Sequence, residues 1–215
     1  MTPAESRGTY HHGALREELI TACLALIESE GIGAVSLRKV ARQAGVSPAA
    51  PYHHFADRAA LLNAITARGY ELLLGEMRRA VEAAASPVAA LGALIEAYVR
   101  FAHANTAYVR LIYRPELTEA DKDPAIEVQT QAGLRLLADT VAACQAAGAA
   151  PAGDPAALST MVWSVAAGLA MLIVDGPLEH LTAERGSTVP ELTGQVSALV
   201  QTLLLGYATS ALDGR

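Results

Sequence analysis

The sequence predicts an all-α protein of about nine helices. Alanine is abundant, and glycines and prolines are scattered rather than clustered, a composition that favours helices. No alternating run of Val, Ile and Thr is long enough to indicate a sheet. Hydrophobic residues make up 52% of the 215 residues, so the chain can bury a sizeable core.

The N-terminal part, residues 1–60, is predicted to hold three helices, and a fourth leads into the second part, residues 61–215. Glycines 31 and 33 end the first helix, while Ser36 and Asp57 are suited to cap the second and fourth. A proline in its first turn supports the third helix. The expected boundaries of these four helices are residues 14–29, 36–44, 48–55 and 57–84.

The second part is also predicted to be helical, with proline and glycine marking the turns. Its expected helices cover residues 87–105, 107–114, 124–147, 155–174 and 190–211. Residues 116–123 and 182–189 are expected to be loops. The most apolar span, residues 156–174, carries alanines and polar side chains that fit a buried helix better than a membrane span.

Residues 36–55 predict a helix-turn-helix. Ala41 supplies the small side chain that two steeply crossing helices require, Gly45 suits a left-handed helix end, and Val46 fills the angle between the helices. A unit of this kind places its second helix in the major groove of DNA.

The net charge of −6 is unusual for a DNA-binding protein, but the acidic excess lies outside the motif. The first 60 residues carry six basic and six acidic side chains. Four of the basic ones surround the helix-turn-helix: Arg38, Lys39, Arg42 and Arg58. Local sign matters more than total charge for contact with phosphate, so the motif can still meet DNA.

The N-terminal part resembles the DNA-binding domain of the TetR/AcrR family of transcriptional regulators. The resemblance covers residues 13–62, and its most specific segments are residues 36–41, 44–47, 52–55 and 57–62. It implies a cytoplasmic, nucleoid-associated repressor that a small molecule releases from a palindromic double-stranded operator. It also implies a two-fold dimer in which the last two long helices of each subunit pair.

The candidate DNA contacts combine chemistry with this resemblance. Hydroxyls at helix N-termini suit phosphate oxygens, and Lys39 can reach a phosphate or a guanine edge. The resemblance implies that Tyr52 and His53 reach phosphates or bases and that Arg58 lies against the DNA backbone. The full set is Ser36, Lys39, Ser47, Pro48, Ala49, Ala50, Tyr52, His53 and Arg58.

The predicted reading face is poor in hydrogen-bonding groups. Ala49 and Ala50 face the groove and can offer only methyl contacts, which suit thymine. Pro51 has no N–H to offer the helix. Part of the specificity is therefore expected from DNA shape. Residues 1–9 are expected to form a mobile arm, and Arg7, Tyr10, His11 and His12 are either a disordered tail or a minor-groove contact.

A ligand pocket is expected among the C-terminal helices. Tyr98, Phe101, Asn105 and Tyr108 are spaced at offsets of three and four residues, which places them on one helix face. Met161 and Trp163 are further aromatic or flexible side chains of the kind that line pockets. Simple core packing is the alternative for each of these residues.

Other functions find little support in the sequence. No nucleophile, base and orienting group form a recognisable motif, so neither an enzyme nor a cofactor is expected. The adjacent histidine pairs diverge too far on a helix to share a tetrahedral metal, and Cys23 and Cys144 have no metal spacing. No signal peptide and no membrane partner are expected. An activator, a partner-controlled regulator without a small-molecule ligand, and a helical interaction protein without DNA remain alternatives.

Overall fold

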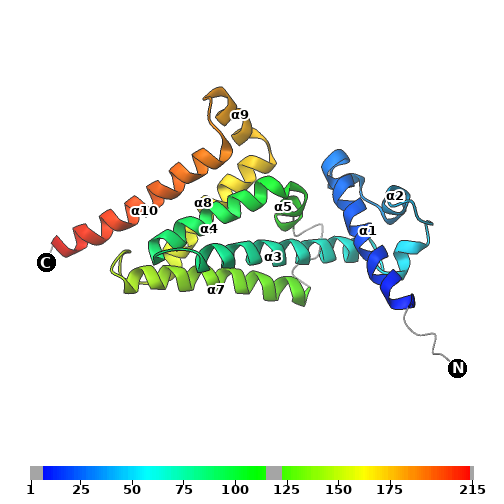
Figure 1. Cartoon of the computed structure of the whole chain (residues 1–215), viewed down its shortest axis with the longest axis horizontal. Coiled ribbons are helices and arrows are strands. Elements are labelled where there is room, and N and C mark those ends of the chain that lie inside the picture. Colours follow the sequence, from blue (N-terminus) through cyan, green and yellow to red (C-terminus); the bar gives the residue numbers. More distant parts are fainter. Residues whose placement is uncertain (1–6, 115–122, 214–215) are drawn as a thin grey trace.

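The computed structural model describes residues 7–114 and 123–213, and the side chains of residues 14–114 and 123–205. This described part forms nine α-helices and two short 3₁₀ turns and contains no strand, which confirms the predicted all-α fold (Figure 1). The first elements are α1 (Arg7–Glu30), η1 (Ile32–Ala34), α2 (Leu37–Gln43), η2 (Ala50–His53) and α3 (Arg58–Glu82). The others are α4 (Pro87–Ala104), α5 (Thr106–Ile112), α7 (Pro124–Ala146), α8 (Pro155–Val174), α9 (Pro177–Glu184) and α10 (Val189–Asp213).

The helices form a small head and a larger body. The head contains α1, α2, η2 and the first turns of α3, and it lies at one end of the molecule (Figure 1). Helix α3 continues without a break into the body, where it packs against α4, α5 and α7. Helices α8 and α10 both pack on α4, and the C-terminal end of α10 lies opposite the head.

Short side chains cap most helix starts. Ser36 accepts a hydrogen bond from the Lys39 backbone N–H at 3.2 Å, and Asp57 accepts one from Ala60 at 2.8 Å. Asp154 caps α8 in the same way, through the Ala156 backbone N–H at 2.9 Å. These caps, predicted from the sequence, satisfy N–H groups that have no partner inside the helix.

Helix α1 begins earlier than predicted. Its backbone is helical from Arg7, not from residue 14, because no proline or capping side chain at residue 14 interrupts the hydrogen-bonded ladder. Residues 7–12 thus form the first turns of α1 rather than an extended arm. The side chains of residues 7–13, like all of residues 1–6, lie outside the described part, so minor-groove contact stays a prediction.

The predicted loop over residues 182–189 is wrong at its start. Helix α9 extends to Glu184, because Gly176 takes a left-handed turn (φ 89°) and Pro177 is set for a first helical turn. Leu178 and Thr182 are buried and hold this short helix against the body. The other predicted loop, residues 116–123, lies outside the described part except for Asp123, which caps α7.

Helix α8 is less buried than predicted. It is the one described helix long and apolar enough to cross a membrane, with a mean hydropathy of 2.0. Only about a third of that apolar span is buried in the body. One such helix is weak evidence for a membrane segment, because core helices share its composition. Met161 and Leu172 are 39% and 44% exposed, so α8 presents an apolar face outward.

Both cysteines are buried free thiols in the core. Burial raises the pKa of Cys23 to about 12 and raises the pKa of Cys144 as well. A thiol that stays protonated is a poor nucleophile, so both side chains act as small apolar groups.

Candidate DNA-binding head and ligand cavity

The first half of the helix-turn-helix has the predicted geometry. Gly45 has φ +70°, and the Val46 N–H donates back to the Ala41 carbonyl at 2.9 Å, which closes the end of α2. Ala41 is fully buried where the helices cross. The turn therefore depends on one residue with left-handed backbone.

Replacing Gly45 by alanine is expected to destabilise the head. A Cβ at this position meets no atom within 4 Å, so the cost comes from the positive φ alone, about 1–2 kcal/mol. Gly33→Ala is the matched control. Gly33 does not have a positive φ, and a Cβ at that position also meets no atom within 4 Å. Urea unfolding of both variants measures the difference, and equal midpoints would show that the turn tolerates side chains.

The second half of the motif differs from the prediction. The expected α-helix over residues 48–55 is a 3₁₀ turn, η2, whose backbone bonds run three residues back: Ala50 to Ser47 at 3.0 Å and Tyr52 to Ala49 at 3.2 Å. Pro51 is buried, lacks the N–H for a bond to Ser47, and so prevents the α-helical ladder. Ser47 accepts through its backbone and does not cap η2 with its side chain.

Most candidate DNA contacts lie on the outer surface of the head. Ser36, Ser47, Pro48, Ala49, Tyr52 and His53 are exposed, while Lys39 and Ala50 are half-buried. The Tyr52 side chain is 53% exposed although it is large and aromatic, so it is not part of the core. The apolar side chains of Val40, Phe55, Leu61 and Leu62 are all buried in the core.

Two arginines complete the charged part of this surface. Arg38 and Arg42 are both exposed on α2, one helical turn apart. Lys39 is less available, because its ammonium pairs with Glu30 of α1 at 2.6 Å. This hydrogen bond and the lysine charge lower the pKa of Glu30. The arginines belonged to the basic cluster seen in the sequence but not to the predicted contact set.

Arg58 makes two hydrogen bonds inside the head. Its Nε donates to the Val35 carbonyl at 3.0 Å and its Nη2 to the Ile32 carbonyl at 2.9 Å. The half-buried guanidinium therefore braces the connection between α1 and α2 from the first turn of α3. The structure thus gives Arg58 a role inside the head, and its contact with phosphate stays a prediction.

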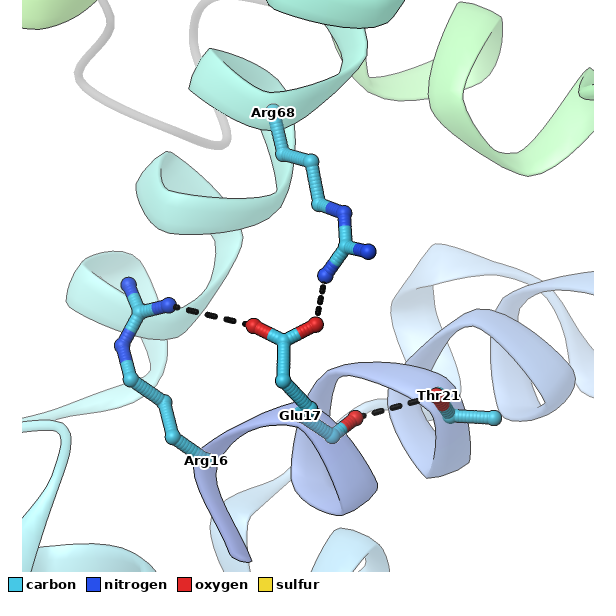
Figure 2. Close-up of polar contacts among 4 residues, drawn as sticks. All are labelled: Arg16, Glu17, Thr21 and Arg68. Atoms are coloured by element: carbon cyan, nitrogen blue, oxygen red, sulfur yellow. Dashed lines mark hydrogen bonds and ion pairs between the residues drawn. The ribbon is translucent and has the colours of Figure 1, made fainter. Parts of the chain in front are cut away.

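A polar cluster joins the head to the long helix α3. Figure 2 shows the Glu17 carboxylate of α1 between two arginines, paired with Arg68 of α3 through one oxygen and facing Arg16 through the other. The Arg16 guanidinium also lies over the Phe55 ring, 5.4 Å from its centre. Thr21 donates to the Glu17 backbone carbonyl at 2.9 Å. The cluster ties α1 to the middle of α3.

The body contains a cavity of about 350 Å³ between α3, α4, α5, α7 and α8, partly open to the outside. Most of its wall is aliphatic, and polar groups are contributed by Tyr70, Tyr98, Tyr113, Gln129, Thr130 and Trp163. The Tyr98 and Tyr113 hydroxyl oxygens lie 2.8 Å apart. A largely apolar cavity with a few polar groups is the usual form of a small-molecule site.

The predicted pocket stripe is split by the structure. Tyr98 and Trp163 line the cavity, but Phe101 and Tyr108 are buried against each other, with ring centres 6.5 Å apart. Asn105 ends α4 with non-helical backbone (φ −138°, ψ 48°), so α5 changes direction and the stripe does not continue. Met161 points to the outer face of α8.

Sequence reasoning missed Tyr70, Tyr113 and Thr130, which lie on three other helical segments and share no spacing with Tyr98. No local pattern identifies these three, because they meet only when α3, α5 and α7 pack around α4.

Two family models match this chain. The model described as "Bacterial regulatory proteins, tetR family" matches residues 19–65, and the model described as "Tetracyclin repressor-like, C-terminal domain" matches residues 91–196. The first match coincides with the head and the second with most of the body.

Comparison with individual proteins agrees with the two family models. The HTH-type transcriptional regulator BetI of Rhizobium meliloti (strain 1021) is 40% identical over 89 residues, which are 40% of this chain and 42% of that protein. The chain thus spans half or less of the curated relatives it matches. A protein of unknown function from Rhodococcus sp. RHA1 is 33% identical and covers 93% of this chain and 100% of its own, with a TM-score of 0.75. The TetR-family regulator PfmR of Thermus thermophilus shares the fold at 20% identity, a TM-score of 0.68 and coverage of 86% and 97%.

Proposed function

The chain belongs to the TetR family of bacterial transcriptional regulators, and on that premise we propose that it is a repressor which a small molecule releases from DNA. It acts as a homodimer on a palindromic double-stranded operator, in the cytoplasm. The head binds DNA, and the cavity in the body binds the effector. We assign it no catalytic reaction and no cofactor.

One observation carries this proposal, the continuity of α3 between the two sites. Its first turn holds the head together through Arg58, and four of its later residues line the cavity: Tyr70, Leu73, Leu74 and Met77. A ligand that shifts the cavity half of this helix moves the head with it. DNA and ligand then favour different positions of α3, so each weakens the binding of the other.

Helix α5 supports the same coupling from the other side of the cavity. Ile112 and Tyr113, at its C-terminal end, line the cavity. The Arg110 guanidinium of the same helix lies 3.5 Å from the Ile27 carbonyl of α1 and 3.5 Å from the Val174 carbonyl of α8. A change at the cavity thus has a second route to the head.

The outer faces of α8 and α10 support dimerisation. Leu199 and Leu203 of α10 are 61% and 67% exposed, and Leu172 of α8 is 44% exposed. No charged residue occurs in α8 or between residues 192 and 205. Apolar faces of this kind are stabilised when a second copy covers them. The two heads of a two-fold dimer would then reach half-sites about one helical turn apart on DNA.

Selection of genomic DNA fragments by the purified full chain tests the proposal. We expect a palindromic sequence with half-sites about one helical turn apart, and thymines where Ala49 and Ala50 meet the groove. Tyr52→Ala should weaken binding to that operator without changing the urea unfolding midpoint, because its side chain is exposed. Sedimentation of the same samples should give a dimer. A monomer at micromolar concentration, or no enriched sequence, would contradict the proposal.

A further inference from the structure

We propose that the cavity binds an amphiphile in one fixed orientation. The ligand has an aliphatic body and a single polar group at one end, and this polar group lies at the end of the cavity nearest the head. This inference rests on the proposed function, because it names the chemical class and the orientation of the effector. The arrangement of polar and aliphatic side chains along the cavity carries it.

Helices α3 and α4 place their polar lining residues at the same end of the cavity. On α3, Tyr70 is the lining residue nearest the head, and the later ones, up to Met77, are leucine or methionine. Helix α4 runs back toward the head (Figure 1). Its last lining residue, Tyr98, is therefore closer to the head than Leu94 and Ile95.

Helix α7 repeats this order. It starts at the head end of the body and runs beside α3 in the same direction (Figure 1). Its first turns reach toward the head, because Asp123 and Gln129 line one surface groove together with Arg16 of α1. Gln129 and Thr130 are the first lining residues of α7, and Leu137 is the last. The polar groups of all three helices thus gather at the head end of the cavity.

The head end offers both donors and acceptors to a ligand. The Tyr98 and Tyr113 hydroxyl oxygens lie 2.8 Å apart, which joins α4 to the end of α5. The Gln129 amide can donate and accept. The Thr130 hydroxyl donates to the Ile126 carbonyl at 2.9 Å and can still accept. A ligand hydroxyl or primary amide, which also donates and accepts, fits this end whichever tyrosine is the donor.

The far end offers no N–H or O–H group on a described side chain. Its lining comes from Met77 of α3, Leu94 of α4 and Leu137 of α7, and all three are buried. A polar ligand group placed there would lose its hydrogen bonds to water without replacement. The aliphatic body of the ligand is therefore expected at this end, where burial of apolar surface supplies affinity.

The dimensions and charge of the cavity complete the description of the ligand. The lining covers the seven residues from Tyr70 to Met77, which is about 10 Å along the α3 axis. No Asp, Glu, Lys, Arg or His of the part that the structure describes lines the cavity. A carboxylate or ammonium would find no opposite charge there, so the polar group is an uncharged one.

Titration of the full chain with four probes of equal length tests this inference. The probes are octane, 1-octanol, 1,8-octanediol and octanoate. Trp163 is the one tryptophan of the chain and lines the cavity, so its fluorescence reports binding. We expect 1-octanol to bind about fivefold more tightly than octane and about tenfold more tightly than the diol, because one hydrogen bond is gained and the second hydroxyl of the diol is buried unpaired. Octanoate should bind more weakly than the alcohol.

A polar side chain at the far end should remove the discrimination against the diol. Met77→Gln places an amide there, and we expect the affinities for 1-octanol and 1,8-octanediol to come within about twofold of each other. Leu72→Gln is the matched control, because Leu72 lies on the same helix, is 42% exposed and does not line the cavity. It should keep the preference for the alcohol. Urea unfolding checks that both variants are folded, and the four probes on the unchanged chain decide the question if Met77→Gln is not.

The outcomes separate this inference from the proposed function. Equal affinity for alcohol and diol, tighter binding of octanoate, no binding of any probe, or a folded Met77→Gln variant that still rejects the diol would overturn it. Operator affinity is measured with and without each bound probe. If octanoate binds best and releases the operator, the regulator proposal stands and the ligand class is wrong. If 1-octanol binds as expected but operator affinity does not change, the ligand class stands and release by ligand fails.

Discussion

Phe101→Ala is expected to lower the free energy of unfolding by about 3–5 kcal/mol, the usual cost of emptying a buried aromatic site. Phe101 is 1% exposed and packs on Tyr108 at the junction of α4 and α5. Phe101 does not line the cavity. Folded protein should therefore keep its affinity for a cavity ligand.

Trp163→Ala is the comparison that separates core from cavity. Trp163 lines the cavity and is 47% exposed, so its loss should cost about 1 kcal/mol or less in stability. Its loss should weaken the binding of a cavity ligand, because it removes part of the cavity wall. Urea unfolding and calorimetry on both variants measure the two effects. Loss of ligand binding by a stable Phe101→Ala variant would mean that Phe101 belongs to the ligand site, as its helical spacing predicted.

The double variant Arg38→Ala, Arg42→Ala is expected to lose most of the DNA affinity. Both guanidinium groups are exposed on α2 beside the candidate contacts. A dimer would lose up to four phosphate contacts. Each contact contributes ~0.9 to the steepness of the plot of log affinity against log salt concentration, so the plot should become less steep by up to ~3.6. Titrating operator at salt concentrations between about 50 and 200 mM gives the slope directly.

A control for this experiment is the double variant Arg78→Ala, Arg135→Ala. It removes the same charge from exposed positions on α3 and α7, in the body. General electrostatic attraction would respond equally to both double variants, whereas direct phosphate contact responds only to the first. An unchanged slope after loss of Arg38 and Arg42 would remove α2 from the DNA interface.

The helices were largely predictable because their signals are local. Ser36, Asp57 and Asp154 cap the helices that they were expected to cap, since a cap needs only the next three residues. Gly45 takes the positive φ that the turn requires. The missing N–H of Pro51 was visible in the sequence and excludes an α-helical bond to Ser47, but an α-helix was still predicted where the structure has the 3₁₀ turn η2.

The lining of the cavity was predictable only in part. Helical spacing placed Tyr98, Phe101 and Tyr108 on one face, but the helix breaks at Asn105, and Tyr108 of α5 is buried against Phe101 in the core. Arg58 shows the same limit in the head. Its type and position suited phosphate, yet the packing of α3 brought two backbone carbonyls within reach of its donors.

The sequence by itself determined the helical composition, the turn around Gly45, the basic surroundings of the motif and the resemblance to a regulator family. These features depend on residues within a few positions of one another. Only the tertiary structure decided that Tyr70, Tyr98 and Tyr113 share a cavity and that α3 joins this cavity to the head. The physical reason is that a side chain's partners are set by the crossing of helices that are remote in sequence, and no local spacing encodes that crossing.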